Sequence, residues 1–382
     1  MKVTGLWLNN PATQQVMSML AGGGFQAFAV GGCVRNALLK IAINDVDIAT
    51  NAHPEQVIAL AKNIGLKTVP TGIEHGTITV VCDNTGFEVT TFRKDIETDG
   101  RRAVVAFAET LDEDAHRRDF TVNALYVDQD GTVTDPLGGL VDIAARKIRF
   151  IDNASDRIRE DYLRILRFFR FHAWYGDAHA GIDAEGLAAC AELAEGIETL
   201  SKERIGHEIL KLLASENPAP SLATMEISGI LARVMPGATA LTVAPLVHFE
   251  QELAVTPDPI RRLAAIGGED PARNLRLSKV EQRRLATLSD GIASAAQMPE
   301  LAYRLGVTAA LDAALLRAAI LQMPVPEGLF QMLQSASEQK FPIAAGDLAG
   351  NFQGASLGAR LKKLEADWIA SGFSLTKRQL LS

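Results

Sequence analysis

The sequence predicts an α+β N-terminal region followed by a longer, almost wholly helical one. Short apolar runs separated by glycine turns fill about the first 150 residues, which is typical of strands and short helices. From about residue 155 the apolar side chains recur at the spacing of amphipathic helices. The 382 residues exceed what one core usually serves, so two to four compact units are expected, with boundaries near 217–220 and 325–328.

The first region alternates strands and helices. Residues 25–30 and 43–50 are predicted strands, and GGCVRNALLK between them turns through two glycines into a helix. Residues 53–65 begin near a proline and stop at a glycine, which predicts a second helix. Two hairpins follow, one in TITVVCD with GFEVTTF and one in FTVNALYVDQDGTVTD.

Composition and charge exclude several classes of protein. The three cysteines, Cys33, Cys82 and Cys190, form no C-x-x-C pair, which argues against a disulfide framework or a thiolate zinc site. The N-terminus lacks the basic and apolar regions of a signal peptide, and no apolar run approaches 18 residues, so a cytoplasmic protein without a membrane span is expected. The net charge of −8 argues against a nucleic-acid partner unless basic side chains are segregated on one surface.

Two aspartates, Asp45 and Asp47, lie two residues apart in the second predicted strand. Side chains at that spacing share a face of a strand, so the carboxylates converge. At a separation of about 5 Å and an effective dielectric near 20 they repel by roughly 3 kcal/mol, which a bound cation such as Mg²⁺ offsets. A solvated turn is the alternative for an isolated D-x-D. Glu88 and Asp119 compete for the role of third acid, and an exposed sheet edge would also explain Glu88.

The glycines before the first helix suit a phosphate. Gly31 and Gly32 let backbone N–H groups and the helix N-terminus approach its oxygens, and Arg35 follows one turn later. The stretch is neither G-x-G-x-x-G nor a Walker loop, and a routine strand-to-helix turn remains the alternative. Arg117 and Arg118 directly precede a predicted strand. Two adjacent charged residues at such a place are usually exposed to solvent, which is the alternative to a role in binding.

EDYLRILRFFRF (160–171) is the most informative segment. As one helix it puts apolar side chains on one half and Asp161, Arg164, Arg167 and Arg170 on the other, like the wall of an anion-binding cleft. Salt bridges on a solvated face are the alternative. Aspartate only accepts and arginine only donates hydrogen bonds, so Asp161 with Arg164 would fit cytosine and adenine and leave uracil and guanine mismatched.

Together these segments resemble a known family. GGCVRN with DVDIAT, HGTITV with FEVTTFRKD, RRDFTVNAL, EDYLRILRFFRF and ERIGHEILKLL are similar, in that order, to the motifs of class II tRNA nucleotidyltransferases and bacterial poly(A) polymerases, most of all CCA-adding enzymes. The resemblance implies a polymerase-β-like nucleotidyltransferase head followed by an elongated all-α neck, body and tail. The expected domains are head 1–150, neck 151–216, body 217–290 and a tRNA-binding tail 291–382.

The resemblance also implies roles for single residues. Asp45 and Asp47 would hold Mg²⁺, whereas Glu88 is expected as the third catalytic acid from its place in GFEVTTF alone. The nucleotide would be bound by Gly32, Arg35, Arg118, Asp161, Arg164, Arg167 and Arg170, with Asp161 and Arg164 as a protein template for CTP and ATP. Residues 93–105, which include Arg101, match the flexible loop linked to the switch from C to A addition. Asn36 and Ala103 depart from an aspartate and a proline that are frequent in the family.

The implied activity is CCA addition to the tRNA 3′ end without a nucleic-acid template. The alternatives are a poly(A) polymerase, partial CC or A addition, a catalytically silent tRNA-binding protein, and a metal-dependent nuclease. Seven basic residues between 259 and 287, with three more in 350–364, are candidates for contacts with the tRNA backbone, and solvated helix faces explain them equally well. The sequence leaves monomer and dimer open.

Overall fold

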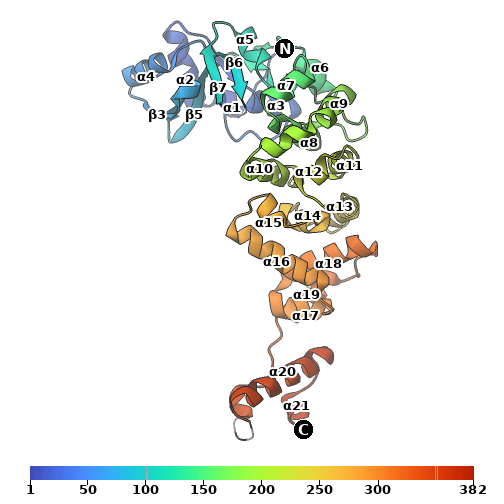
Figure 1. The fold of residues 1–382 in the computed structure, drawn as a ribbon. Coiled ribbons are helices and arrows are strands. Elements are labelled where there is room, and N and C mark those ends of the chain that lie inside the picture. The colour runs from blue at the N-terminus through green and yellow to red at the C-terminus, as the bar shows by residue number, and fades with distance from the viewer. Residues whose placement is uncertain (100–101, 349, 351) are drawn as a thin grey trace. The chain divides into compact units, whose positions relative to one another are not determined.

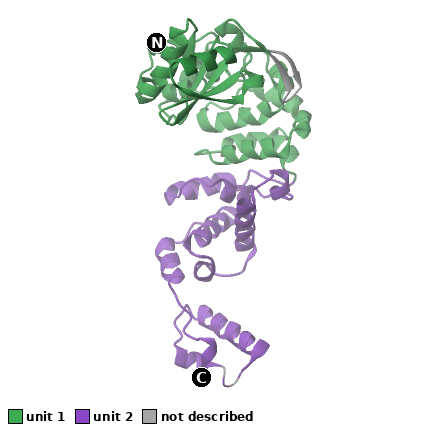
Figure 2. Ribbon diagram, turned by 90° about the vertical axis from the view of Figure 1, so that its left-hand side faces the viewer, with its two compact units in different colours: residues 1–236 green, residues 237–382 purple. Residues whose placement is uncertain are grey.

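The structure is a computed structural model that describes residues 1–99, 102–348, 350 and 352–382, with side chains described outside 95–105. The chain forms two compact units, Met1–Pro236 and Gly237–Ser382 (Figure 2). The predicted fold class is confirmed, because a head with a mixed sheet is followed by helices (Figure 1). The predicted division into head, neck, body and tail stays a prediction. No helix in the described residues is long and apolar enough to cross a membrane.

A seven-stranded sheet organises the head, in the order β3-β4-β5-β2-β1-β8-β9, and β6 and β7 form a separate hairpin. Among the strand pairs of this sheet, β2 with β5 is parallel, and the others are antiparallel. The strands are β1 (Ala27–Val30), β2 (Asp47–Thr50), β3 (Lys67–Gly72), β4 (Thr77–Cys82), β5 (Thr85–Thr91), β6 (Arg93–Asp99), β7 (Arg102–Phe107), β8 (Tyr126–Val127) and β9 (Val133–Thr134).

Helices α2 and α4 pack on one face of this sheet. Val89 in β5 and Ile48 in β2 are fully buried, as strands covered by helices require. The head helices are α1 (Leu6–Asn9), α2 (Pro11–Gly22), α3 (Gly32–Leu39), α4 (Pro54–Asn63), α5 (Leu111–His116) and α6 (Gly139–Ala144), with short 3-10 turns η1 (Ile73–His75) and η2 (Thr121–Asn123).

The second strand is shorter than predicted. It begins at Asp47, and residues 41–46 have no regular structure, so the prediction of a strand over 43–50 is wrong for its first half. The reason is the length of its antiparallel partner: Val30, the last residue of β1, pairs with Asp47, and the chain then turns at Gly31. Residues before Asp47 therefore have no neighbouring strand in β1 to pair with.

The helices after the head begin with a break. Helix α7 (Ala154–Glu160) ends before Asp161, which is extended with φ −155° and ψ 106°, and α8 (Leu163–Tyr175) starts two residues later. The prediction of one helix over 160–171 is therefore wrong at its first turn. The Asp161 carboxylate accepts a hydrogen bond from the Leu163 amide at 3.1 Å, which satisfies one of the free backbone N–H groups at the start of the new helix.

The remaining helices of the first unit follow α8. They are α9 (Ala184–Glu192), η3 (Ala194–Thr199), α10 (Lys202–Leu213), α11 (Ala219–Ile227) and α12 (Ile230–Val234). Helix α10 has its apolar side chains on one face, with Ile205, Ile209 and Leu212 buried, and it packs along α8. This pairing sets the charged side chains of the two helices beside each other.

The described part of the second unit is helical. It comprises α13 (Val243–Glu252), α14 (Pro259–Ile266), α15 (Pro271–Asn274), α16 (Lys279–Ala293), α17 (Met298–Leu305), α18 (Val307–Leu321), α19 (Leu329–Ser337), η4 (Ala345–Asp347), α20 (Gly354–Ala370) and α21 (Lys377–Leu381). Trp368 and Leu364 anchor α20 in a small apolar core with Leu380.

Two of the basic residues expected on its surface are inside this unit. Arg261 and Arg262 are buried and pair with the buried Glu250, and Arg261 also pairs with Asp312. Buried arginines are stable when carboxylates pair with them, and these do. Both residues are therefore wrong as candidates for tRNA contacts, whereas Arg283 on α16 is exposed.

Candidate active site

A cavity of about 640 Å³ collects most of the predicted site residues in the first unit. Of the residues named from the sequence, it is lined by Gly31, Gly32, Arg35, Asp47, Arg117, Arg118, Asp119, Asp161, Arg164, Arg167 and Arg170. Asp45 and Glu88 are outside the lining. A smaller cavity of about 280 Å³, beside Phe150 and Asp183, contains none of the predicted residues.

Asp47 lines one end of this cavity, where β2 and β5 run in parallel, and other acidic side chains lie beside it. Asp47 pairs in register with Glu88, so the two carboxylates are direct neighbours on adjacent strands. Loss of water around Asp47 is the main cause that raises its pKa to about 6, and repulsion from Glu88 adds to it. Asp45 raises this pKa further, and Arg118 opposes the rise. Strand β5 lies between β4 and β2, so Glu88 is not at a sheet edge, although its side chain is exposed as that alternative expected.

The acids suit a hard cation bound by two carboxylates and a phosphate. In the described part of the chain no three His, Cys, Asp or Glu side chains are grouped as a complete metal site. Mg²⁺ commonly takes one or two protein carboxylates and completes its shell with water and substrate phosphate. Part of the Asp47 side chain stays open to solvent while the surrounding protein displaces water from its carboxylate, and its mutual repulsion with Asp45 and Glu88 is what a cation would relieve. The donor set therefore fits magnesium.

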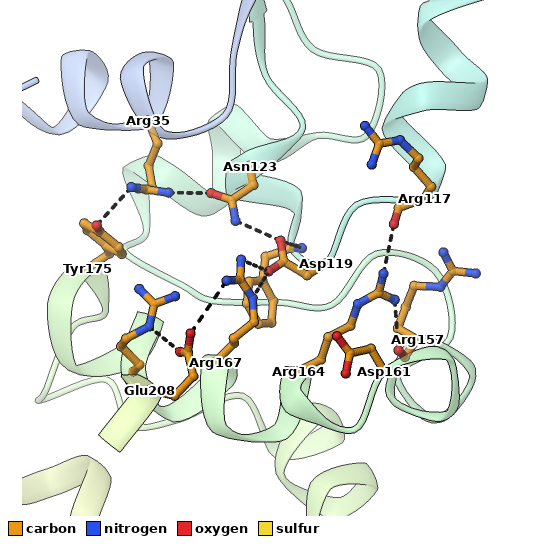
Figure 3. A network of polar contacts seen from close by, with 12 residues as sticks. Arg35, Arg117, Asp119, Asn123, Arg157, Asp161, Arg164, Arg167, Tyr175 and Glu208 are labelled. Carbon is orange, nitrogen blue, oxygen red and sulfur yellow. Dashed lines mark hydrogen bonds and ion pairs between the residues drawn. The ribbon is translucent and has the colours of Figure 1, made fainter. Parts of the chain in front are cut away.

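Asp119, the other candidate for third acid, has a different partner. Its Oδ2 accepts hydrogen bonds from Arg167 Nε at 2.7 Å and Nη2 at 2.5 Å, and its Oδ1 accepts one from Asn123 Nδ2 at 2.8 Å (Figure 3). Burial disfavours the charged form of Asp119, but Arg167 outweighs burial and lowers the pKa to about 2. Asp119 thus orients an arginine.

Other buried carboxylates orient the remaining arginines. Glu208 of α10 accepts a hydrogen bond from Arg170 Nε at 2.5 Å, and its other oxygen lies 3.9 Å from Arg167 Nη1. Asp114 of α5 accepts bonds from Arg118 Nη2 at 2.9 Å and from the Tyr126 hydroxyl at 2.8 Å. These side chains present a preformed set of cations on one wall of the cavity.

The pair expected to read the base, Asp161 and Arg164, faces the cavity from either side of the helix break. Asp161 Oδ2 accepts a hydrogen bond from Arg204 Nη2 at 2.6 Å. Arg164 donates to the carbonyl oxygens of Arg157 and Arg117 at 2.9 and 3.1 Å (Figure 3). It also donates to Glu160 at 2.5 Å. Each member is therefore held by protein groups.

Several lining residues were not predicted. They include Asn123, Phe171, Arg204 and Lys211. Arg204, Glu208 and Lys211 follow one another at spacings of four and three in ERIGHEILKLL, so they share one face of α10. That spacing is the signal that could have identified them. Asn123 comes from η2, and no periodic pattern marks it.

The segment predicted as a flexible loop is a hairpin of β6 and β7 where its backbone is described. Arg93 Nη1 donates to the carbonyl oxygen of His75 at 2.6 Å, and the Arg93 amide donates to Asp114 at 3.4 Å. Arg101 lies outside the described residues. The role of this segment in switching between nucleotides stays a prediction.

Two family models match the chain. One, described as "Poly A polymerase head domain", covers residues 27–149. The other, described as "Probable RNA and SrmB- binding site of polymerase A", covers residues 181–241. The two matches fall on the sheet of the head and on the helices that follow α8.

Named relatives match over most of the chain. CCA tRNA nucleotidyltransferase 1, mitochondrial, of Mus musculus is 33% identical over 92% of this chain and 85% of its own length. The CCA-adding enzyme of Leuconostoc citreum is 41% identical over 62% of this chain and 57% of its own length. The crystal structure of the Bacillus stearothermophilus CCA-adding enzyme in complex with CTP is 27% identical, with a TM-score of 0.70 over 94% of this chain and 93% of that one. The Thermotoga maritima CCA-adding enzyme complexed with tRNA, at 19% identity and a TM-score of 0.68 over 92% of this chain and 88% of that one, supports the fold alone.

Proposed function

This chain belongs to the CCA tRNA nucleotidyltransferase family, and we propose that it adds CMP, CMP and AMP to the 3′ end of tRNA and releases pyrophosphate. The observation that carries the proposal is the single cavity that joins Asp47 to the arginine wall of α8. Phosphoryl transfer needs charge stabilisation and positioning rather than covalent catalysis. A carboxylate end for metal and an arginine wall for phosphates supply both.

The acidic end would hold the metal and the reacting groups. Asp45 and Asp47 would be the ligands of Mg²⁺, and Glu88 lies in register beside Asp47 as the third acid. When bound, the metal supplies Lewis-acid activation of the attacking hydroxyl and neutralises charge on the leaving pyrophosphate. Arg118 is the cation that counters the charge of Asp47.

The opposite wall would bind the nucleotide. Arg167 and Arg170 present their guanidinium groups to the triphosphate while Asp119 and Glu208 hold them in place. Asp161 would accept a hydrogen bond from the exocyclic amine of cytosine or adenine, and Arg164 would donate one to the neighbouring ring nitrogen. Uracil and guanine present the opposite pattern, so they would leave both groups mismatched.

The tRNA body would be bound by helical parts of the chain after the head. We propose head 1–150, neck 151–216, body 217–290 and tail 291–382 as the functional division. Exposed cations on α15, on α16, on the link between them and on α20 are the candidates for phosphate contacts, and they are Arg273, Arg276, Lys279, Arg283, Lys362 and Lys363.

The experiment uses a tRNA transcript that lacks its last three nucleotides. With Mg²⁺, the expected products are two added residues with CTP alone, none with ATP alone and three with both, and none when EDTA removes the metal. A long A tract would favour a poly(A) polymerase, products that stop at two or grow by A alone would favour partial addition, and shortening would favour a nuclease. Asp47→Ala should abolish extension, and Asp130→Asn, which changes an exposed turn, should not. Normal extension by Asp47→Ala would refute the assignment.

A further inference from the structure

We propose that Tyr175 is a positioning residue that sets the guanidinium group of Arg35 for a phosphate oxygen at the glycine turn. Arg35 lies in α3 of the head and Tyr175 is the last residue of α8. The identity of the phosphate as part of a nucleoside triphosphate rests on the function proposed above. The positioning role itself rests on the contacts of these two side chains.

Tyr175 contacts Arg35 in two ways (Figure 3). Arg35 Nη2 donates a hydrogen bond to the Tyr175 hydroxyl at 2.9 Å, and the guanidinium carbon lies 4.0 Å from the centre of the Tyr175 ring. Phe171, one turn earlier in α8, lies 5.1 Å from the same carbon. A cation that lies over an aromatic face and donates a hydrogen bond to the hydroxyl of the same side chain has both its position and its orientation fixed.

Arg35 differs from the other arginines of the cavity in having only neutral acceptors. Its Nη1 donates to Asn123 Oδ1 at 2.5 Å, and its Nη2 donates to Asn36 Oδ1 at 2.9 Å as well as to Tyr175. Within the described residues it makes no ion pair with a carboxylate, whereas Arg118, Arg167 and Arg170 each do. Arg35 therefore keeps a positive charge that no protein anion contacts.

The position of Arg35 shows what kind of ligand this charge suits. The side chain is 6% exposed, lines the cavity, and has a buried Nε without a hydrogen-bond partner. A side chain added at Gly32 would place its Cβ 3.8 Å from Arg35 Nη2, so the bare glycine turn lies against the guanidinium group. Backbone amides of a glycine turn beside an arginine favour an anionic oxygen, and above all a phosphate.

Tyr175 links this head arginine to the neck helix that carries Arg167 and Arg170. Without it, Arg35 would keep two amide acceptors and lose the ring that fixes its plane. Asn36 explains why the tyrosine matters, because a neutral amide holds the guanidinium less strongly than a carboxylate would. The Asn36 Nδ2 group donates to the Ala42 carbonyl at 2.9 Å, so its Oδ1 is fixed toward Arg35.

The test measures binding and turnover separately. Inorganic tripolyphosphate with Mg²⁺ is titrated into the full chain by calorimetry, and the KM for CTP and kcat are measured on the truncated tRNA. Tyr175→Phe, which keeps the ring, should raise both the Kd for tripolyphosphate and the KM for CTP by about fivefold. Tyr175→Leu, which also removes the ring, should raise both values by about thirtyfold. In both variants kcat should change much less than KM.

Two further variants make the result decisive. Asn36→Ala in the Tyr175→Leu background should weaken tripolyphosphate binding further, because it removes one of the two amide acceptors that still hold Arg35. Tyr303→Phe removes a hydroxyl that bonds Glu365 in the second unit and should change neither value. Unchanged affinity for tripolyphosphate in Tyr175→Leu, or no further loss with Asn36→Ala, would overturn the inference. Failure of the parent chain to extend tRNA while tripolyphosphate binding follows these variants would refute the proposed function alone.

Discussion

Replacing Glu208 by glutamine should lower the stability of the fold and, at the same time, strengthen the binding of CTP. Glu208 is 4% exposed and lies 2.5 Å from Arg170 Nε and 3.9 Å from Arg167 Nη1. At an effective dielectric near 20 these distances correspond to attractions of roughly 7 and 4 kcal/mol, most of which the cost of desolvation offsets. Breaking a buried pair usually costs about 3 to 5 kcal/mol. We expect about 2 to 3 kcal/mol for Glu208→Gln, because the amide still accepts from Arg170 and Asp119 still pairs with Arg167.

The effect on ligand binding should have the opposite sign. Removing a negative charge beside the arginine wall raises the positive potential of the cavity, so the Kd for CTP should fall while the fold becomes less stable. The control is Glu203→Gln, an exposed position in the same helix. Its free energy of unfolding should change by no more than about 0.5 kcal/mol.

Urea unfolding followed by tryptophan fluorescence measures the stability. Trp174 donates a hydrogen bond from its indole to the Lys211 carbonyl at 2.7 Å, so it reports on α8 and α10 where Glu208 lies. Trp7→Phe and Trp368→Phe remove the other two tryptophans. A loss below about 1 kcal/mol, or weaker binding of CTP, would refute the reasoning about Glu208.

Three other changes test separate parts of the structure. The pKa of Asp119 falls from 3.8 to about 2 on folding, so its pairing with Arg167 stabilises the fold above pH 4, and this stabilisation is lost as the pH falls toward 2. Asp119→Asn should therefore lower the Tm at pH 7 and flatten the dependence of the Tm on pH between 4 and 2. An unchanged slope would contradict this. Gly196→Ala should cost about 1 to 3 kcal/mol in urea unfolding, because its Cβ would meet the Tyr162 ring at 1.9 Å, and a neutral result would show that the ring moves freely. Glu250→Gln should lower the unfolding midpoint of the second unit by leaving buried arginines short of a partner, with the KM for CTP unchanged, and a changed KM would show that this network reaches the active site.

The sequence was most informative where a pattern is local. The turn at Gly31 and Gly32, the hairpins and the arginines of α8 follow from spacing along the chain, and the structure has them as expected. The breaks were missed because they depend on partners. Strand β2 starts late because β1 ends at Val30, and the helix breaks at Asp161 because its carboxylate binds a backbone amide, neither of which alters apolar periodicity.

The spacing of residues along the chain could not predict which residues far apart in the sequence pair with each other. Asp119 lies 48 positions before Arg167, and Glu208 lies 38 positions after Arg170. Adjacent arginines such as Arg261 and Arg262 usually lie on a solvent-exposed surface. Here they are buried, and the carboxylates that pair with them come from other helices. The fold class could be predicted because it needs only periodicity and turns, whereas the orientation of the site needs contacts between elements.

The acidic composition of the chain and its basic cavity are consistent once the charges are placed. Eight arginines and lysines line the cavity against three aspartates, although the whole chain carries a net charge of −8. Adding Asp114, Glu160 and Glu208, which pair with lining arginines, still leaves an excess of two positive charges. Charge of one sign in a cleft focuses the field there, so an anionic ligand is attracted to the cavity and repelled by much of the remaining surface. The buried acids hold the arginines in place without cancelling this field, which is why total charge is a poor guide to the ligands of this protein.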